Sequence, residues 1–294
     1  MKLRIKYSYI AEGIVLICAL LVVVVLKLYN YDIGNGGSKI AYDVSINLMA
    51  ASVLAFVFEF FGDKMVMNKT MSCERDTIFR VDTIVRPALR RFSLLYIQLS
   101  CADWNKAKCI CDSASHPDGL IECMPENFSI SEMMNLFMPS MFIGGSFRRT
   151  AVEEFFEQEH RIEYEFAMAL RMNEFAYYSK IRLIMMEFVD YCSTITCEKA
   201  IVDATKMTAG TEKISTQITK WLKDGSVYKF YNDVVSGKQK LSGNLMADYV
   251  QLYEKMRKER AILIRYDRAI RELRQQYCNL GYNRVECDRL TKSN

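Results

Sequence analysis

The chain has 294 residues, of which 51% are hydrophobic and 25% are charged, with 4 prolines. That balance excludes a disordered or collagen-like chain, because such chains are poorer in apolar residues or far richer in proline. Lysine and arginine number 39 against 35 acidic residues, an excess too small to indicate a nucleic-acid-binding protein by itself. With 2 histidines, a histidine-rich metal centre is excluded, and no cofactor is expected.

Two apolar segments near the N-terminus are each long enough to cross a membrane. The first covers residues 10–28, the second covers residues 40–61, and a glycine-rich link separates them. A helix rises about 1.5 Å per residue, so roughly twenty residues cross the hydrocarbon layer. Residues 1–62 are therefore predicted to form a two-helix transmembrane hairpin. A cleaved signal peptide is the alternative for the first segment, but no small-residue cleavage site follows it closely.

The flanking cations predict the orientation of this hairpin. Lysines and arginines gather before the first segment and after the second. Because positively charged flanks stay in the cytoplasm, both termini are expected there. The cysteines agree, since nine of the 10 follow residue 62 with irregular spacing, which suits a reducing compartment.

A polar stripe follows one face of the second segment. Ser45, Ser52 and Glu59 recur every seven residues, and Glu12 of the first segment is expected at the same end of the hairpin as Glu59. Small and polar residues mediate helix association in lipid. Two interpretations stay open: the stripe packs against a neighbouring helix, or it lines a pore in an oligomer, where Glu12 would add a second acidic ring.

Residues 63–294 are predicted to form a cytoplasmic helical domain, since apolar residues recur at three- and four-residue steps and strand-like alternation is scarce. Helices are expected over residues 70–100 with a kink or a new start at Pro87, over 147–192, in one or two pieces over 198–236, and over 245–277. The predicted fold class is all-α: a two-helix transmembrane hairpin followed by a cytoplasmic helical bundle with a long C-terminal helix.

The last helix carries an apolar seam. Its apolar residues keep alternating four-three spacing from Leu245 to Leu280, and Glu259 is the one interruption. Such a seam requires a helical partner, which is either the 147–192 helix of the same chain or a second subunit.

The same helix is basic. Eight cations lie between Glu254 and Arg274, and they indicate either a face that pairs with the acidic stretch 153–165 or a surface for nucleic acid or anionic lipid. The helix lacks the interleaved aromatic residues of a platform for single strands. The cations expected to contact a partner are Arg257, Lys258, Arg265 and Arg268.

Zinc-type ligands gather in one loop-rich segment. It contains Cys101, Cys109, Cys111, His116 and Cys123, but a single residue between Cys109 and Cys111 departs from the usual ligand spacing. Free thiols and no bound metal are therefore expected.

Two further motifs carry little chemistry. Glu157-x-x-His160 has the step of di-iron bundles but no second copy, so surface charge is expected. Gly144-Gly145-Ser146 is interpreted as a loop in which Ser146 caps the next helix. No nucleophile elbow, kinase set or dinucleotide fingerprint is present, and the chain is not expected to be an enzyme.

A basic N-terminus, two closely spaced spans and about 230 helical cytoplasmic residues resemble, in layout, the two-transmembrane effectors of bacterial antiphage defence systems, retron-associated effectors among them. The resemblance implies a protein of the bacterial inner membrane that a cytoplasmic protein or nucleoprotein regulator holds silent, such as a reverse transcriptase with its nucleic acid. When infection is sensed, such an effector damages or depolarises the membrane, and homo-oligomers would form the conducting path. The alternatives are a membrane-tethered scaffold or adaptor and a membrane-bound zinc enzyme.

Overall fold

The computed structural model describes residues 7–28, 36–114, 119–133, 135–136, 138, 140, 149–194, 197–206, 220–240 and 244–279. Every regular element over these ranges is a helix, and no strand occurs among them. The chain divides into two compact units, Met1–Cys73 and Glu74–Asn294. The predictions of an all-helical chain with an apolar N-terminal helix and a long C-terminal helix are confirmed.

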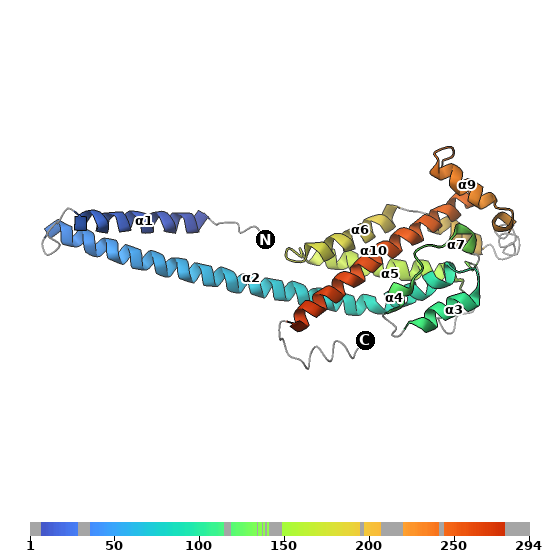
Figure 1. Ribbon diagram of the computed structural model, residues 1–294, viewed down its shortest axis with the longest axis horizontal. Helices are drawn as coiled ribbons and strands as arrows, with labels where there is room; N and C mark the ends of the chain where they lie inside the picture. Colours follow the sequence, from blue (N-terminus) through green and yellow to red (C-terminus); the bar gives the residue numbers. More distant parts are fainter. Residues whose placement is uncertain are drawn as a thin grey trace. The chain divides into compact units, whose positions relative to one another are not determined.

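The first unit contains α1 (Tyr7–Leu28) and the beginning of α2 (Gly36–Leu99), both in blue in Figure 1. Each of the two helices is long and apolar enough to cross a membrane, with a mean hydropathy of 2.6 over Ala11–Leu28 and of 1.9 in the most apolar window of α2. Their large apolar side chains are mostly exposed, Leu21 and Phe58 among them. Exposed apolar surface on this scale indicates contact with something other than water.

Helix α2 is a single helix of 64 residues, so the second apolar segment and the expected 70–100 helix are continuous. The helix also passes through Pro87, and the expected alternative of a new start there is wrong. Proline removes one backbone hydrogen bond from a helix. Here its ring is exposed, while Arg86 and Ala88 beside it are buried, so packing of the neighbouring residues holds the helix together.

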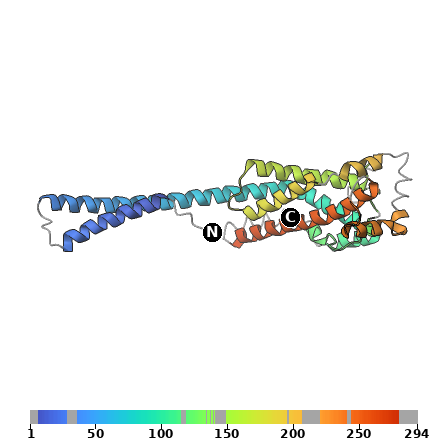
Figure 2. The same ribbon diagram turned by 90° about the horizontal axis from the view of Figure 1, so that it is seen from above.

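The second unit contains the rest of α2 and the helices that pack around it. These are α3 (Trp104–Ser113), α4 (Leu120–Cys123), the 3₁₀ turn η2 (Ile130–Glu132), α5 (Ala151–Met172), α6 (Ser179–Thr194), α7 (Cys197–Lys206), α9 (Ser226–Val235) and α10 (Leu245–Asn279). Helix α10 contacts α4, α6, α7 and α9, and α6 also contacts α5 (Figures 1 and 2).

Aromatic rings in tilted and edge-to-face contact form much of the core of the second unit. The Phe92 ring of α2 lies 4.7 Å from that of Phe155 in α5, measured between centroids. Tyr266 of α10 lies 4.8 Å from Phe166 of α5, which also contacts Phe188 of α6. All five rings are fully buried. Burying such rings supplies roughly 1.5–3 kcal/mol each relative to exposure, which makes this cluster a main source of stability.

The apolar seam of α10 is buried inside the chain. Leu252, Met256, Leu263 and Ile270 have no exposed surface, and the seam faces α6 and α7. Of the two partners expected for the seam, helices of the same chain therefore supply the contact. That contact comes from α6 and α7 and only to a lesser extent from α5.

The expected helix over 147–192 is two helices, α5 and α6. Asn173 ends α5, and its side-chain amide donates to the carbonyl oxygen of Ala169 at 3.1 Å. Phe175 then takes a left-handed backbone with φ +47°, a conformation that non-glycine residues rarely adopt. Its ring is buried, so packing stabilises the strained turn. Periodicity did not reveal this break because apolar residues continue across it.

Helix α5 is capped by Thr150, and the expectation that Ser146 is the cap is wrong. The Thr150 hydroxyl accepts from the backbone N–H of Glu153, while the Glu153 carboxylate accepts from the Thr150 N–H at 2.8 Å. This reciprocal pair satisfies two amides at the start of the helix. Gly144, Gly145 and Ser146 lie outside the described residues.

Candidate functional site

The polar stripe of the first unit faces inward. Ser45 is 6% exposed, and Ser52, Glu59 and Glu12 are half-buried, whereas most apolar residues between Ser45 and Glu59 are exposed. The carboxyl group of Glu12 in α1 lies beside that of Glu59 in α2. The structure therefore brings these two predicted carboxyl groups together at one level of the two helices.

Two carboxyl groups at one site repel each other when both are ionised. The second oxygen of Glu12, Oε2, is buried without a hydrogen-bond partner. An ionisable pair among apolar helices is expensive to maintain, and such groups in membrane segments usually mark a path for ions or protons. The pair is the strongest candidate for a functional group in the first unit.

The four predicted partner-binding cations lie along α10, and two of them pair with one acidic residue of α6. The Glu187 carboxylate lies 3.3 Å from Lys258 and 2.7 Å from Arg265. Partial burial would raise the pKa of Glu187, but the hydrogen bonds from Arg265 and Lys258 outweigh it and lower that pKa. The acidic partner of these two cations is therefore in α6 and not in the stretch 153–165.

The other two cations, Arg257 and Arg268, have different surroundings. Arg257 lies 3.6 Å from Glu254, and both side chains are over 40% exposed. Arg268 lines a shallow cavity of about 330 Å³ together with Arg265 and Lys180. Exposed ion pairs contribute only about 0–1 kcal/mol, so Arg257 can exchange Glu254 for another anion at little cost.

A buried ionic cluster lies where the seam of α10 is interrupted. The Lys255 ammonium lies 2.6 Å from Glu159 of α5 and 3.0 Å from Glu259, one turn along α10. The Cys192 thiol of α6 donates to Glu259 at 3.8 Å. The sequence placed Lys255 among the surface cations, but its side chain is buried. The sequence pattern along α10 does not show that Lys255 is buried. The burial follows from the two buried carboxylates, Glu159 and Glu259, which require a counter-ion.

This cluster is also the strongest candidate for a metal site. Glu159, Cys192 and Glu259 offer ligand atoms within 4.8 Å of one another, and no other group of three such residues occurs among the residues described. The Lys255 ammonium already occupies the position of a cation between the two carboxylates. Burial and the neighbouring Glu159 raise the pKa of Glu259 well above its ordinary value. The raised pKa favours a proton on Glu259, and the Lys255 ammonium lies between the two carboxyl groups. These groups therefore stabilise the packing of α5 against α10.

A second buried network joins α2 to α10. Asp82 lies 2.7 Å from Arg86 in the same helix and 2.6 Å from Arg274 of α10, and Arg86 also pairs with Asp267. Sequence reasoning missed this network. Its signal was the spacing of Asp82 and Arg86, four residues apart on the same helix.

The cysteines of the proposed zinc segment do not gather into a metal site. Cys101, Cys109, Cys111 and Cys123 are free thiols, and they form no three-ligand group within the part of the chain that the structure describes. His116 lies outside the described residues. Burial raises the pKa of Cys111 to about 11, so this thiol is protonated and a poor nucleophile at neutral pH.

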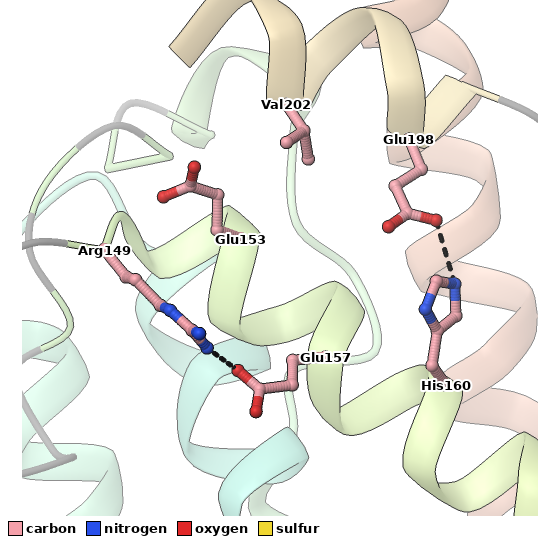
Figure 3. A pocket seen from close by; sticks show the side chains of 6 residues that line it. All are labelled: Arg149, Glu153, Glu157, His160, Glu198 and Val202. Atoms are coloured by element: carbon pink, nitrogen blue, oxygen red, sulfur yellow. Dashed lines mark hydrogen bonds and ion pairs between the residues drawn. The ribbon is translucent and has the colours of Figure 1, made fainter. Parts of the chain in front are cut away.

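Glu157 and His160 line a surface cavity of about 380 Å³ between α5 and α7 (Figure 3). Glu157 pairs with Arg149, and His160 pairs with Glu198 at 2.9 Å. The two residues of the Glu-x-x-His step thus turn to different partners, and both side chains are over 50% exposed. They carry surface charge in this arrangement and do not converge on a common point.

Comparison of the chain with models of known protein families, with curated proteins and with solved structures finds no match.

Proposed function

We propose that the protein is a membrane-anchored effector that depolarises the bacterial inner membrane when a partner complex sensing phage infection releases it. The observation that carries the proposal is the contact between Glu12 and Glu59. A passive tether needs apolar residues only, and one span suffices. Two spans that join through a carboxyl pair maintain an ionisable group where it is costly, and a role in ion passage accounts for that cost.

In this proposal α1 and the first part of α2 form an antiparallel hairpin in the membrane, and a helical bundle follows in the cytoplasm together with both termini. Ser45 and Ser52 face inward within one chain, which corresponds to the silent state. Conduction requires several copies whose hairpins open or rotate so that these hydroxyls and the two glutamates line a shared path. Rings of acidic side chains favour cations, so the expected consequence is depolarisation.

The regulator is proposed to bind the exposed cations of α10. All four side chains are exposed, and Lys258 and Arg265 also keep Glu187 as an internal partner. A nucleoprotein such as a reverse transcriptase with its nucleic acid has the negative charge that this face requires.

The test measures membrane potential in bacteria that express the chain from an inducible promoter, with a potential-sensitive dye. Glu59→Gln and Glu12→Gln are each expected to slow depolarisation about tenfold, because the amides keep the size of the side chain but cannot ionise. Ser45→Ala combined with Ser52→Ala is expected to slow it less. Alanine is the sharper replacement, because a leucine at the buried Ser45 would also disturb packing.

The matched control replaces Val44 and Val53 by leucine. These exposed residues each neighbour one serine, and their replacement leaves the stripe unchanged. The control is expected to depolarise cells like the wild type, with all variants present in the membrane at equal amounts. If Glu12→Gln and Glu59→Gln depolarise cells as fast as the wild type, the carboxyl pair carries no current and the proposal fails.

The second candidate function is a membrane-tethered scaffold or adaptor. The burial of Ser45 within a single chain favours it, since a serine that packs one helix against another needs no further role. In that case expression leaves the membrane potential unchanged in every variant, while the cytoplasmic unit still captures its partner.

A further inference from the structure

A pocket lined by aromatic residues lies between α9, the segment before η2, and α10. Its volume is about 400 Å³, within the usual range for small-molecule sites. We call it the aromatic pocket. The residues that matter here are Asn127, Phe128, Tyr228, Tyr231, Tyr253 and Arg257.

The wall of the aromatic pocket is rigid. The Tyr253 ring contacts Phe128 edge to face at 5.1 Å between centroids, and it contacts Tyr231 in the same way at 5.5 Å. The Tyr253 hydroxyl donates to the carbonyl oxygen of Phe128 at 2.9 Å, and the Tyr231 hydroxyl donates to Glu254 at 2.9 Å. Burial and Glu254 raise the pKa of Tyr231 to about 12, so this hydroxyl stays a donor at neutral pH. Both rings are fixed before any ligand arrives.

The mouth of the aromatic pocket is open and offers a flat ring. Tyr228 lies one turn before Tyr231 on α9 and is 55% exposed. Asn127 is also exposed, and its amide provides both a donor and an acceptor. An exposed ring beside an uncommitted amide suits a planar ligand with hydrogen-bonding edges.

Arg257 supplies the charge. Its guanidinium carbon lies 5.5 Å from the centroid of the Tyr253 ring, and Glu254 at 3.6 Å is its partner. A cationic ligand is disfavoured beside this guanidinium. An anion such as phosphate can take the place of the exposed Glu254 contact, since arginine binds phosphate with two parallel hydrogen bonds.

We infer that the aromatic pocket binds a nucleotide, with the base stacked on Tyr228 and the phosphate held by Arg257. Helix α10 supplies the buried ring of Tyr253 beside Arg257, and α9 adds the exposed ring of Tyr228 to the same pocket. Aromatic rings that accept bases, next to a cation that accepts phosphate, are the two components of single-strand recognition. The ligand is either a free nucleotide or one unit of a single-stranded nucleic acid. In the second case the inference rests on the proposed contact between α10 and a nucleoprotein.

The test measures fluorescence anisotropy with the full chain in detergent micelles. The probes are fluorescein-labelled single-stranded oligothymidylate and fluorescein-labelled AMP, and an unlabelled DNA duplex serves as competitor. Tyr228→Ala is expected to weaken binding about tenfold, since stacking on an aromatic side chain contributes that much per base. Tyr228→Phe keeps the ring and is expected to bind like the wild type. Arg257→Gln is expected to weaken binding and to reduce the salt slope by about 0.7.

The matched controls are Tyr164→Ala on α5 and Arg182→Gln on α6, an exposed tyrosine and an exposed arginine away from the aromatic pocket. Both are expected to bind like the wild type. Tighter binding of the oligomer than of AMP identifies single-stranded nucleic acid as the source, and equal binding identifies the free nucleotide. The inference is overturned if neither probe binds, if Tyr228→Ala binds like Tyr228→Phe, or if the duplex competes as well as the single strand. This assay contains no membrane potential, so its failure is independent of the proposed membrane activity.

Discussion

The two compact units of the chain distribute their side chains in opposite ways. In Met1–Cys73 the large apolar residues, such as Leu20 and Phe58, are exposed, and the polar Ser45 is buried. In Glu74–Asn294 rings such as Phe92 and Phe155 are buried instead. Apolar burial stabilises a fold only against water, whereas helices in lipid associate through polar contacts and close packing. The opposite patterns therefore indicate two different solvents for the two units.

The units also differ in how they treat buried charge. In the second unit each buried carboxylate network contains cations, as Lys255 does between Glu159 and Glu259. In the first unit the group that contacts Glu12 is a second carboxyl, Glu59. Lys255 thus offsets the charge of two carboxylates in the second unit, whereas Glu12 has a further carboxyl group as its neighbour.

The largest expected effect comes from removing the central cation of the second unit. Lys255→Met leaves Glu159 and Glu259 buried without a counter-ion and is expected to lower the free energy of unfolding by about 3–5 kcal/mol. Both tryptophans, Trp104 and Trp221, belong to the second unit, so urea unfolding followed by tryptophan fluorescence reports on it.

Lys180→Met serves as the control for Lys255→Met. Lys180 pairs with Glu272 at 2.9 Å, but both side chains are over half exposed, and the expected loss is below about 1 kcal/mol. Equal losses for the two variants would contradict the assignment of Lys255 to a buried cluster.

A single acidic substitution tests the contrast between the exposed surfaces. Leu20 on α1 and Tyr164 on α5 are 48% and 61% exposed, respectively. Leu20→Asp is expected to disfavour insertion by about 2.5–3.5 kcal/mol, because a carboxylate is costly in lipid. Tyr164→Asp is expected to change stability by about 0.5 kcal/mol or less. Fractionation of membranes, with alkaline extraction, measures the first, and urea unfolding measures the second. Complete retention of Leu20→Asp in extracted membranes would show that this surface does not face lipid.

The smallest expected effect concerns pH. The pKa of Glu259 is raised in the folded state by burial and by Glu159, so the folded chain binds a proton more tightly than the unfolded chain. Protonated Glu259 therefore contributes to the free energy of unfolding below the ordinary pKa of glutamate, and this contribution is lost as pH rises through the raised pKa. The expected decline is at most about 1.4 kcal/mol per pH unit. Glu259→Gln should make the free energy of unfolding, measured by urea titration at several pH values, less dependent on pH. If the variant shows the same dependence as the wild type, the proton belongs to another group.

Helical class and the two apolar segments could be predicted from the sequence because period and hydropathy are local properties. The break between α5 and α6 could not, because it depends on contacts from outside that segment. The Glu74 carboxylate of α2 accepts from the backbone N–H groups of Ala176 and Tyr177, and Phe175 turns its ring inward. Nothing in the sequence near residue 175 reveals a carboxylate about 100 residues earlier.

The polar groups show the same limit. The interruption of the seam at Glu259 was visible in the sequence, but its partner Glu159 comes from another helix. The aromatic pocket likewise combines Tyr228 and Tyr231 of α9 with Arg257 of α10, which no single helix pattern contains. Spacing finds residues that share a helix, and sites between helices require the fold.

The two buried networks also affect the order in which the chain is made. Asp82 and Arg86 sit one turn apart in α2, while their α10 partners Asp267 and Arg274 follow 181 and 192 residues later, respectively. At about 5–20 residues per second, a ribosome takes roughly 10–40 s to reach them. During that interval the nascent helix already carries the counter-ion of its own carboxylate. The incomplete chain therefore keeps this charge paired until its last helix is made.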